Sequence, residues 1–227
     1  MGYTLVTANR NYSSWSLRPW MLMKALGIPF RDRIEPFTKA INYEEFRTFS
    51  PTGQVPVLID GERTVWDSLG IVLYLAQRHE GVWPDDGETR AYVMCATAEM
   101  HAGFGALRSQ CPMNVGVRVR KTAPDTGLEK DVARLREVFE NGLLRFGGPW
   151  LAGPRFSALD AFFAPVAYRV RTYGLDVGTG AAWVEHILEH EAMREWERAA
   201  LSESWREQSH EDELAAMGVI TEDFRRT

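Results

Sequence analysis

The turn into the first helix of this chain reads Asn11-Tyr12-Ser13-Ser14-Trp15-Ser16-Leu17-Arg18-Pro19-Trp20. It follows a strand-like run, residues 3–7, and opens an apolar helical segment, residues 17–26, which Gly27 ends. Three serines stand where a thiol-disulfide oxidoreductase of the same apparent fold would carry a cysteine. A hydroxyl there can donate a hydrogen bond to an incoming sulfur but cannot form a disulfide. The turn therefore indicates thiol activation rather than disulfide exchange.

The composition narrows the class of protein. The chain has 227 residues, which suits one large domain or two smaller ones. Its net charge of -5 argues against nucleic acid as the main partner. Cys95 and Cys111 have neither CxxC nor metal-ligand spacing, so we expect two reduced, mostly buried thiols and no metal. No signal peptide is evident, and no apolar run reaches the ~20 residues of a membrane span, so a cytoplasmic location without membrane partners is the expectation.

The first 80 residues alternate strand and helix signals in the order β-α-β-α-β-β-α. A weak strand is expected at 30–36 and a short helix at 43–49. Residues 57–59 and 64–66 flank an Asp60-Gly61 pair, a typical hairpin turn. Asp67-Ser68 then caps a helix that runs to about residue 79.

Residues 80–87 are rich in glycine, proline and acidic side chains and are predicted to be a linker. Everything after the linker reads as helical, with apolar-periodic segments at 89–108, 125–146, 157–173, 183–198 and 204–217. The sequence therefore predicts an α/β domain at 1–82 and an all-helical domain at 88–227. Within the second domain, Ser157 and Asp160 form a capping-box pattern that we interpret as structural.

The serine turn could stabilise an anion, because a strand-to-helix junction presents free N–H groups and the positive end of the helix dipole. A free thiol with a pKa near 8.5 is only ~3% thiolate at pH 7, and lowering the pKa by about two units takes roughly 2.7 kcal/mol. A hydroxyl from Ser13 or Ser14 is suited to supply part of this. The alternative is that one of these serines is simply an N-cap.

Two further features could bind a peptide. Pro56 starts a buried strand, where it removes a ladder donor. A cis Val55-Pro56 bond would leave the Val55 N–H and C=O facing a cleft, free to pair with an extended backbone, whereas an ordinary trans proline would not. At the next helix start, Ser68 could hold a carboxylate and Asp67 an ammonium, or the two could form a plain capping pair.

These features share one ligand, a short peptide with a thiol, an extended backbone and a free amino-acid end, and glutathione has those parts. On Gln54-Val55-Pro56, Asp67-Ser68 and the helical second half, the sequence resembles the glutathione S-transferase family over nearly its whole length. The resemblance implies a thioredoxin-like N-terminal domain, glutathione as co-substrate and a homodimer. The run 13–18 is similar to the serine motif of the zeta class, which has a cysteine where Trp15 stands.

The resemblance also implies roles for single residues. It makes Ser13 the first candidate for the thiolate-stabilising hydroxyl, then Ser14, then Ser16. It implies that Pro56 is cis and that Val55 pairs with the cysteinyl backbone. Asp67 stands where the family often has Glu or Gln, one methylene longer. The implied glutathione-binding set is Gln54, Val55, Pro56, Asp67, Ser68 and Lys39.

A second-substrate pocket is expected from the helical half, where Met100, Phe104 and Leu107 lie close to one helix face and Gly103 and Gly105 leave space beside it. Core packing is the alternative. The candidate pocket residues are Trp15, Met100, His101, Phe104 and Arg108.

The predicted function is conjugation of glutathione to a hydrophobic electrophile, as in detoxification. One alternative is a glutathione-dependent isomerase of the maleylacetoacetate type, which would need cations such as Arg18, Arg108 and Arg118 for two carboxylates. The other is a non-catalytic glutathione-binding protein of this fold.

Overall fold

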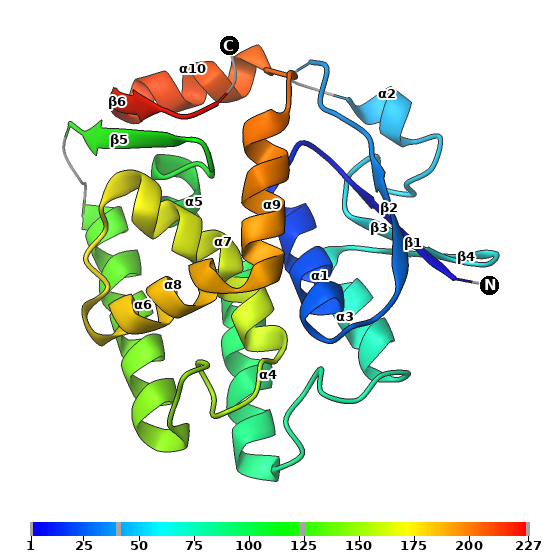
Figure 1. Ribbon diagram of the computed structural model, residues 1–227, viewed down its shortest axis with the longest axis vertical. Helices are drawn as coiled ribbons and strands as arrows, with labels where there is room; N and C mark the ends of the chain where they lie inside the picture. The colour runs from blue at the N-terminus through cyan, green and yellow to red at the C-terminus, as the bar shows by residue number, and fades with distance from the viewer. Residues whose placement is uncertain (1, 40–41, 123–125, 226–227) are drawn as a thin grey trace.

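The computed structural model describes residues 2–39, 42–122 and 126–225. Residues 1 and 226–227, at the outer bounds of the two predicted domains, and Asp125, the predicted start of one helix, lie outside the described residues. Figure 1 shows two halves packed side by side, with the sheet of the N-terminal half on one side and a group of long helices on the other.

The N-terminal half follows the predicted β-α-β-α-β-β-α order. Its elements are β1 (Tyr3–Thr7), α1 (Ser14–Ala25), β2 (Phe30–Ile34), α2 (Tyr43–Phe46), β3 (Val57–Asp60), β4 (Arg63–Trp66) and α3 (Ser68–Ala76). The strands form a sheet in the order β2-β1-β3-β4, in which β1 and β2 are parallel and the other pairs antiparallel. This topology brings the end of β1, the start of β3 and the start of α3 to one edge, which is where the peptide-binding signals lie in the sequence.

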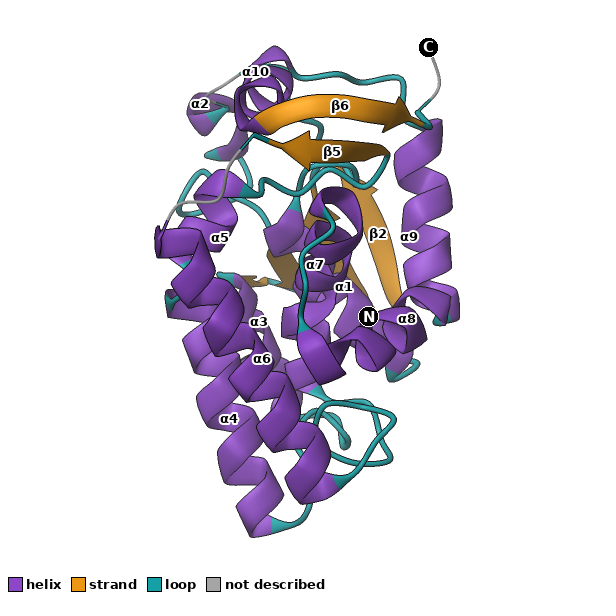
Figure 2. Cartoon of the chain, turned by 90° about the vertical axis from the view of Figure 1, so that its left-hand side faces the viewer, coloured by secondary structure: helices purple, strands orange, loops and turns teal. Residues whose placement is uncertain are grey.

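The C-terminal half is mostly helical. Its helices are α4 (Gly87–Ala102), α5 (Gly105–Gln110), α6 (Thr126–Phe146), α7 (Ala158–Tyr173), α8 (Ala181–Glu189), α9 (Glu191–Ser202) and α10 (Gln208–Met217), with a 3₁₀ turn at Gly178–Gly180. Helix α7 is apolar on nearly all sides and is buried along most of its length, as expected for a central helix. It packs against both α1 and α4, so it joins the two halves (Figure 2).

The predicted helix at 89–108 is broken. Helix α4 ends at Ala102, and Phe104 takes a left-handed conformation with φ 57° and ψ 41° before α5 begins. That conformation is uncommon for a bulky residue. The Phe104 side chain is buried, with its ring edge-to-face on Phe163 at 6.3 Å between centroids, and this tertiary contact accompanies the break.

The C-terminal half also contains a two-stranded antiparallel sheet that the sequence did not predict, so the expectation of a purely helical second half was too simple. It pairs β5 (Val117–Lys121) with β6 (Gly218–Asp223). The strands lie about a hundred residues apart in the sequence, and each is too short to signal its partner. Figure 2 shows the pair beside α10.

The structure bears on two expectations from the composition, namely buried thiols and the absence of a membrane-spanning helix. Both cysteines are free, but only Cys111 is buried, whereas Cys95 is exposed. Among the described residues, no helix has both the length and the apolar character needed to cross a bilayer.

Candidate functional site

A cavity of about 670 Å³ opens between the serine turn, the loop before β3, the start of α3 and the helical half. From the N-terminal half it is lined by Tyr12, Ser13, Ser14, Trp15, Phe37, Asn42, Tyr43, Phe46, Thr52, Gly53, Gln54, Val55, Pro56, Trp66, Asp67 and Ser68. From the helical half come Arg108, Pro112, Met113, Arg169, His210 and Glu213. The three sequence features that suggested a peptide ligand therefore face one space.

The three serines of the turn have different hydrogen-bonding roles. Ser13 is the N-cap residue of α1, but its side chain makes no capping hydrogen bond. Its hydroxyl instead donates to Ser16 Oγ at 2.7 Å, and Ser16 Oγ accepts the Ala8 N–H at 3.2 Å. Ser16 is fully buried and does not line the cavity, so its hydroxyl ties the turn to the end of β1.

Ser14 is in contact with a buried cation. Its Oγ lies 3.4 Å from Nη2 of Arg169, whose Nε donates to the Cys111 carbonyl at 2.8 Å. Burial lowers the pKa of Arg169 to about 10, which leaves the guanidinium charged at neutral pH. Because Ser14 only accepts in this contact, its own proton is free to be donated into the cavity.

The Val55-Pro56 bond is cis, as predicted. Val55 lines the cavity, and neither its N–H nor its C=O is hydrogen-bonded to another described residue. The preceding loop is fixed by Ser50, whose Oγ donates to the Gln54 carbonyl at 2.6 Å and accepts the Gln54 N–H at 3.2 Å. Gly53 has φ +66°, and a Cβ there would come within 2.6 Å of the Tyr43 ring, so the close approach requires glycine.

Asp67 and Ser68 combine a cap with two unsatisfied groups. Asp67 Oδ1 accepts the Leu69 N–H at 2.8 Å, which confirms the cap, and Asp67 takes an unusual positive φ of 65°. The Ser68 hydroxyl is buried and has no hydrogen-bond partner among the described residues. A buried hydroxyl without a partner at a helix N-terminus is a favourable position for a carboxylate oxygen.

Several predicted site residues lie outside the cavity wall. Lys39 is exposed and is ion-paired with Glu45. Met100 and Phe104 are buried in the core, in line with the packing alternative. His101 does not line the cavity. Its ring centroid lies 5.5 Å from that of Trp15 and its Nε2 3.6 Å from Asp67 Oδ1, and burial lowers its pKa.

Of the cations named for a diacid, Arg108 lines the cavity, but Arg118 lies on β5 with its guanidinium over Phe224.

No local sequence signal marks several wall residues from distant parts of the chain. Arg169 is separated from Ser14 by 155 positions, and nothing local marks it as a site residue. His210 of α10 is stacked between Tyr12, at 4.8 Å, and Phe37, at 5.3 Å between ring centroids. Arg169 reaches the cavity from α7, and His210 reaches it because the C-terminal segment from Glu203 to Arg225 folds back over the serine turn.

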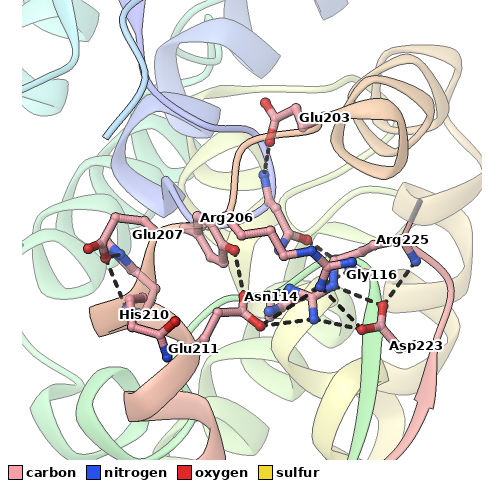
Figure 3. Close-up of polar contacts among 12 residues, drawn as sticks. Asn114, Gly116, Glu203, Arg206, Glu207, His210, Glu211, Asp223 and Arg225 are labelled. Atoms are coloured by element: carbon pink, nitrogen blue, oxygen red, sulfur yellow. Dashed lines mark hydrogen bonds and ion pairs between the residues drawn. The ribbon is translucent and has the colours of Figure 1, made fainter. Parts of the chain in front are cut away.

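A polar network holds this C-terminal segment in place (Figure 3). The Tyr12 hydroxyl donates to Glu211 Oε1 at 2.5 Å, and Arg225 donates to both Glu211 and Asp223. Glu203 accepts the N–H groups of Arg10 and Asn11, at 2.7 and 3.3 Å. The backbone and side chains just before the serine turn are therefore fixed by residues near the other end of the chain.

Comparison with protein families assigns residues 12–78 to the model described as glutathione S-transferase, N-terminal domain. A dichloromethane dehalogenase from Methylophilus leisingeri is 39% identical over 71 residues, which is 29% of this chain and 27% of that protein. Glutathione S-transferase F14 from Arabidopsis thaliana is 31% identical over 156 residues, covering 62% of this chain and 61% of the relative. The matched segments thus span less than two thirds of these relatives.

The solved structures that match are similar over more of the chain. A glutathione transferase homologue from Burkholderia with bound glutathione superposes with a TM-score of 0.67 at 19% identity, covering 88% of this chain and 98% of the other. A homologue from Drosophila mojavensis, also with bound glutathione, gives 0.66 at 17% identity, with 96% and 98% covered. At these identities the match shows the fold, and it confirms a thioredoxin-like N-terminal half joined to a mostly helical one.

Proposed function

We propose that this chain is a member of the glutathione S-transferase family that binds glutathione in the cavity, stabilises its thiolate and transfers it to an electrophilic small molecule. In this proposal residues 1–82 bind glutathione and residues 88–227 supply the wall against which the electrophile lies. The observation that carries it is the convergence of the free Val55 backbone groups, the unpartnered Ser68 hydroxyl and the Ser14 hydroxyl on one cavity.

Each part of glutathione has a complementary group. The γ-glutamyl carboxylate is suited to Ser68 Oγ and the N-terminus of α3, and its ammonium to Asp67. The cysteinyl N–H and C=O match the free backbone of Val55. The glycyl end then lies toward Gln54, and Lys39 would reach it only by leaving its ion pair with Glu45.

We assign the hydrogen bond to sulfur to Ser14 before Ser13. The Ser13 proton is given to Ser16 Oγ, whereas Ser14 accepts from Arg169 and keeps its proton for the ligand. The Arg169 charge also favours an anion next to that hydroxyl. Together these groups stabilise the thiolate over the thiol, which is the protein's main contribution to the reaction, and the wall residues add orientation.

The chemical step is a nucleophilic attack by sulfur. The thiol proton leaves to solvent, the sulfur lone pair forms a bond to an electrophilic carbon, and the leaving group departs with its bonding electrons. The product is a thioether. Neither Ser13 nor Ser14 forms a covalent bond in this scheme.

The test is the ultraviolet difference spectrum of the glutathione complex, together with conjugation of an aromatic halide. We expect a thiolate band at neutral pH that is weakened in Ser14→Ala. Binding without a thiolate band and without conjugation would instead support the non-catalytic alternative. The same proposal includes a homodimer and a cytoplasmic location, and light scattering of the purified protein tests the first.

A further inference from the structure

Three arginines gather at the helical wall of the cavity. Arg108 on α5 and Arg169 on α7 line it, and Arg18 on α1 lies behind Trp15, with its guanidinium carbon 4.0 Å from the Trp15 ring centroid. The Arg108 guanidinium carbon is 5.4 Å from the same ring. Arg18 and Arg169 are buried, and Arg108 is half-buried.

These charges have no counter-ion in the part of the chain that the structure describes. None of the three forms an ion pair within 4.0 Å. Among the described residues, Arg108 donates only to the Met100 carbonyl, at 3.1 Å, and Nε and Nη1 of Arg18 are buried without a hydrogen-bond partner. Buried cations in proteins are normally paired, so this wall carries surplus positive charge.

Two of the nearby carboxylates already accept backbone hydrogen bonds. Asp131 accepts the Leu107 N–H at 2.8 Å, and Asp67 caps α3. Glu213 lines the cavity but is exposed on α10. Burial lowers the pKa of Arg108, and the Asp131 charge offsets this only in part. Burial also lowers the pKa of Arg18, the charges of Arg169 and Arg108 lower it further, and the Asp67 charge opposes this only in part.

Glutathione does not supply enough negative charge at this wall. In the proposed pose its thiolate lies at Ser14 beside Arg169, and its carboxylates lie near Ser68 and Gln54. Arg108 is then left without an anion. Beside it, Trp15, Pro112 and Met113 offer apolar surface for a carbon skeleton.

We propose that the second substrate is an electrophile that carries a carboxylate, held by Arg108 and the Arg169 charge with its carbon skeleton against Trp15. This inference rests on the proposed glutathione function and names the substrate class of the same site. A planar guanidinium matches a carboxylate with two parallel hydrogen bonds, which favours this anion over a neutral polar group.

Equilibrium binding separates this inference from catalysis. The protein is saturated with S-methylglutathione, which fills the glutathione carboxylate sites and cannot react, and is then titrated by calorimetry with 4-chloro-3-nitrobenzoate or the isosteric 4-chloro-3-nitrobenzamide. We expect the benzoate to bind about tenfold tighter than the amide, the ratio given by one charge-assisted hydrogen-bonding pair. Equal affinities overturn the proposal.

Variants of Arg108 test whether its charge holds the carboxylate. Arg108→Gln is expected to bring the affinity ratio close to one. Arg108→Lys keeps the charge, so it is expected to keep part of the ratio, and it serves as the control if Arg108→Gln does not fold. Arg120→Gln, at the exposed position of β5, removes the same charge away from the cavity and is expected to keep the full ratio. An unchanged ratio in Arg108→Gln, or its loss in Arg120→Gln, overturns the assignment.

Conjugation distinguishes the two proposals. With glutathione, both compounds form a C–S bond at the ring carbon that loses chloride. Turnover of the amide without preference for the benzoate contradicts the carboxylate site alone. Absence of turnover and of a thiolate band contradicts the proposed function, while the binding ratio still decides on the carboxylate site.

Discussion

The Ser13 hydroxyl donates a hydrogen bond to Ser16 Oγ at 2.7 Å, and Ser16 in turn accepts the Ala8 N–H. The hydroxyl groups of these two adjacent serines therefore differ in whether their proton can be donated to a ligand. Ser13 is bound inward, toward the end of β1, whereas Ser14 has only a 3.4 Å contact from Arg169 and an unassigned proton. This difference in hydrogen bonding arises because the buried Ser16 Oγ accepts from Ser13 and not from Ser14. The sequence motif alone does not distinguish the two residues.

Ser14→Ala is expected to raise the pKa of bound glutathione by about one unit or more and to lower kcat/KM by about 10²-fold, since one donor to a developing anion is removed. Titration of the thiolate absorbance against pH measures the first effect directly. Ser14→Thr keeps the hydroxyl and serves as the control. A larger pKa increase in Ser13→Ala than in Ser14→Ala would assign the role to Ser13 instead.

Ser68→Ala is expected to weaken glutathione binding by about tenfold without lowering the stability of the free protein. The Ser68 hydroxyl is buried and unpartnered without ligand, so its removal leaves no donor or acceptor orphaned, whereas the complex loses one hydrogen bond to a charged carboxylate. Calorimetry measures the affinity and urea unfolding the stability. Ser157→Ala is the contrasting variant, because its Oγ caps α7 and its loss costs about 1 kcal/mol. A stability loss of that size in Ser68→Ala would show that its hydroxyl already has a structural partner.

Local signals were sufficient for the N-terminal half. The Asp60-Gly61 pair, the Asp67 cap and the proline before β3 each act within a few residues, and each is where the sequence places it. The capping box of Ser157 and Asp160 is likewise present. These features depend on backbone geometry, which short motifs encode.

Long-range contacts were not predictable in the same way. The helix break at Phe104 comes with a contact to Phe163, about 60 residues away, and β5 finds its partner β6 only in the folded chain. Arg169 and His210 reach the cavity from helices whose sequence pattern reports only which face is apolar. The cavity lining from the N-terminal half could therefore be predicted largely from local motifs, and the lining from the helical half could not.

Arg225→Met is expected to lower the free energy of unfolding by about 2 kcal/mol, because the partly buried Glu211 loses its hydrogen-bonded cation and keeps, as a cationic contact among the described residues, only that of Arg206 at 3.9 Å. The same variant is expected to make the Tyr12 side chain less fixed, since Tyr12 lines the cavity and its hydroxyl donates to Glu211. Urea unfolding gives the stability. Arg198→Met removes an exposed ion pair with Glu191 and is expected to cost under about 1 kcal/mol. Equal losses in the two variants would contradict a structural role for the C-terminal network.

Asp160 predicts a specific pH dependence of stability. Burial raises its pKa to about 6, although hydrogen bonds from the Leu151 N–H, Trp183 Nε1 and Ser157 oppose the increase. The unfolded value is about 3.9, so the folded state holds the proton more tightly. The stabilisation from this proton is therefore fully present below about pH 4 and is lost as the pH rises through about 6. Urea unfolding from pH 4 to 7 should show wild type losing stability relative to Asp160→Asn over that interval, because the amide does not titrate. A difference between the two proteins that stays constant with pH would mean that Asp160 is ionised throughout.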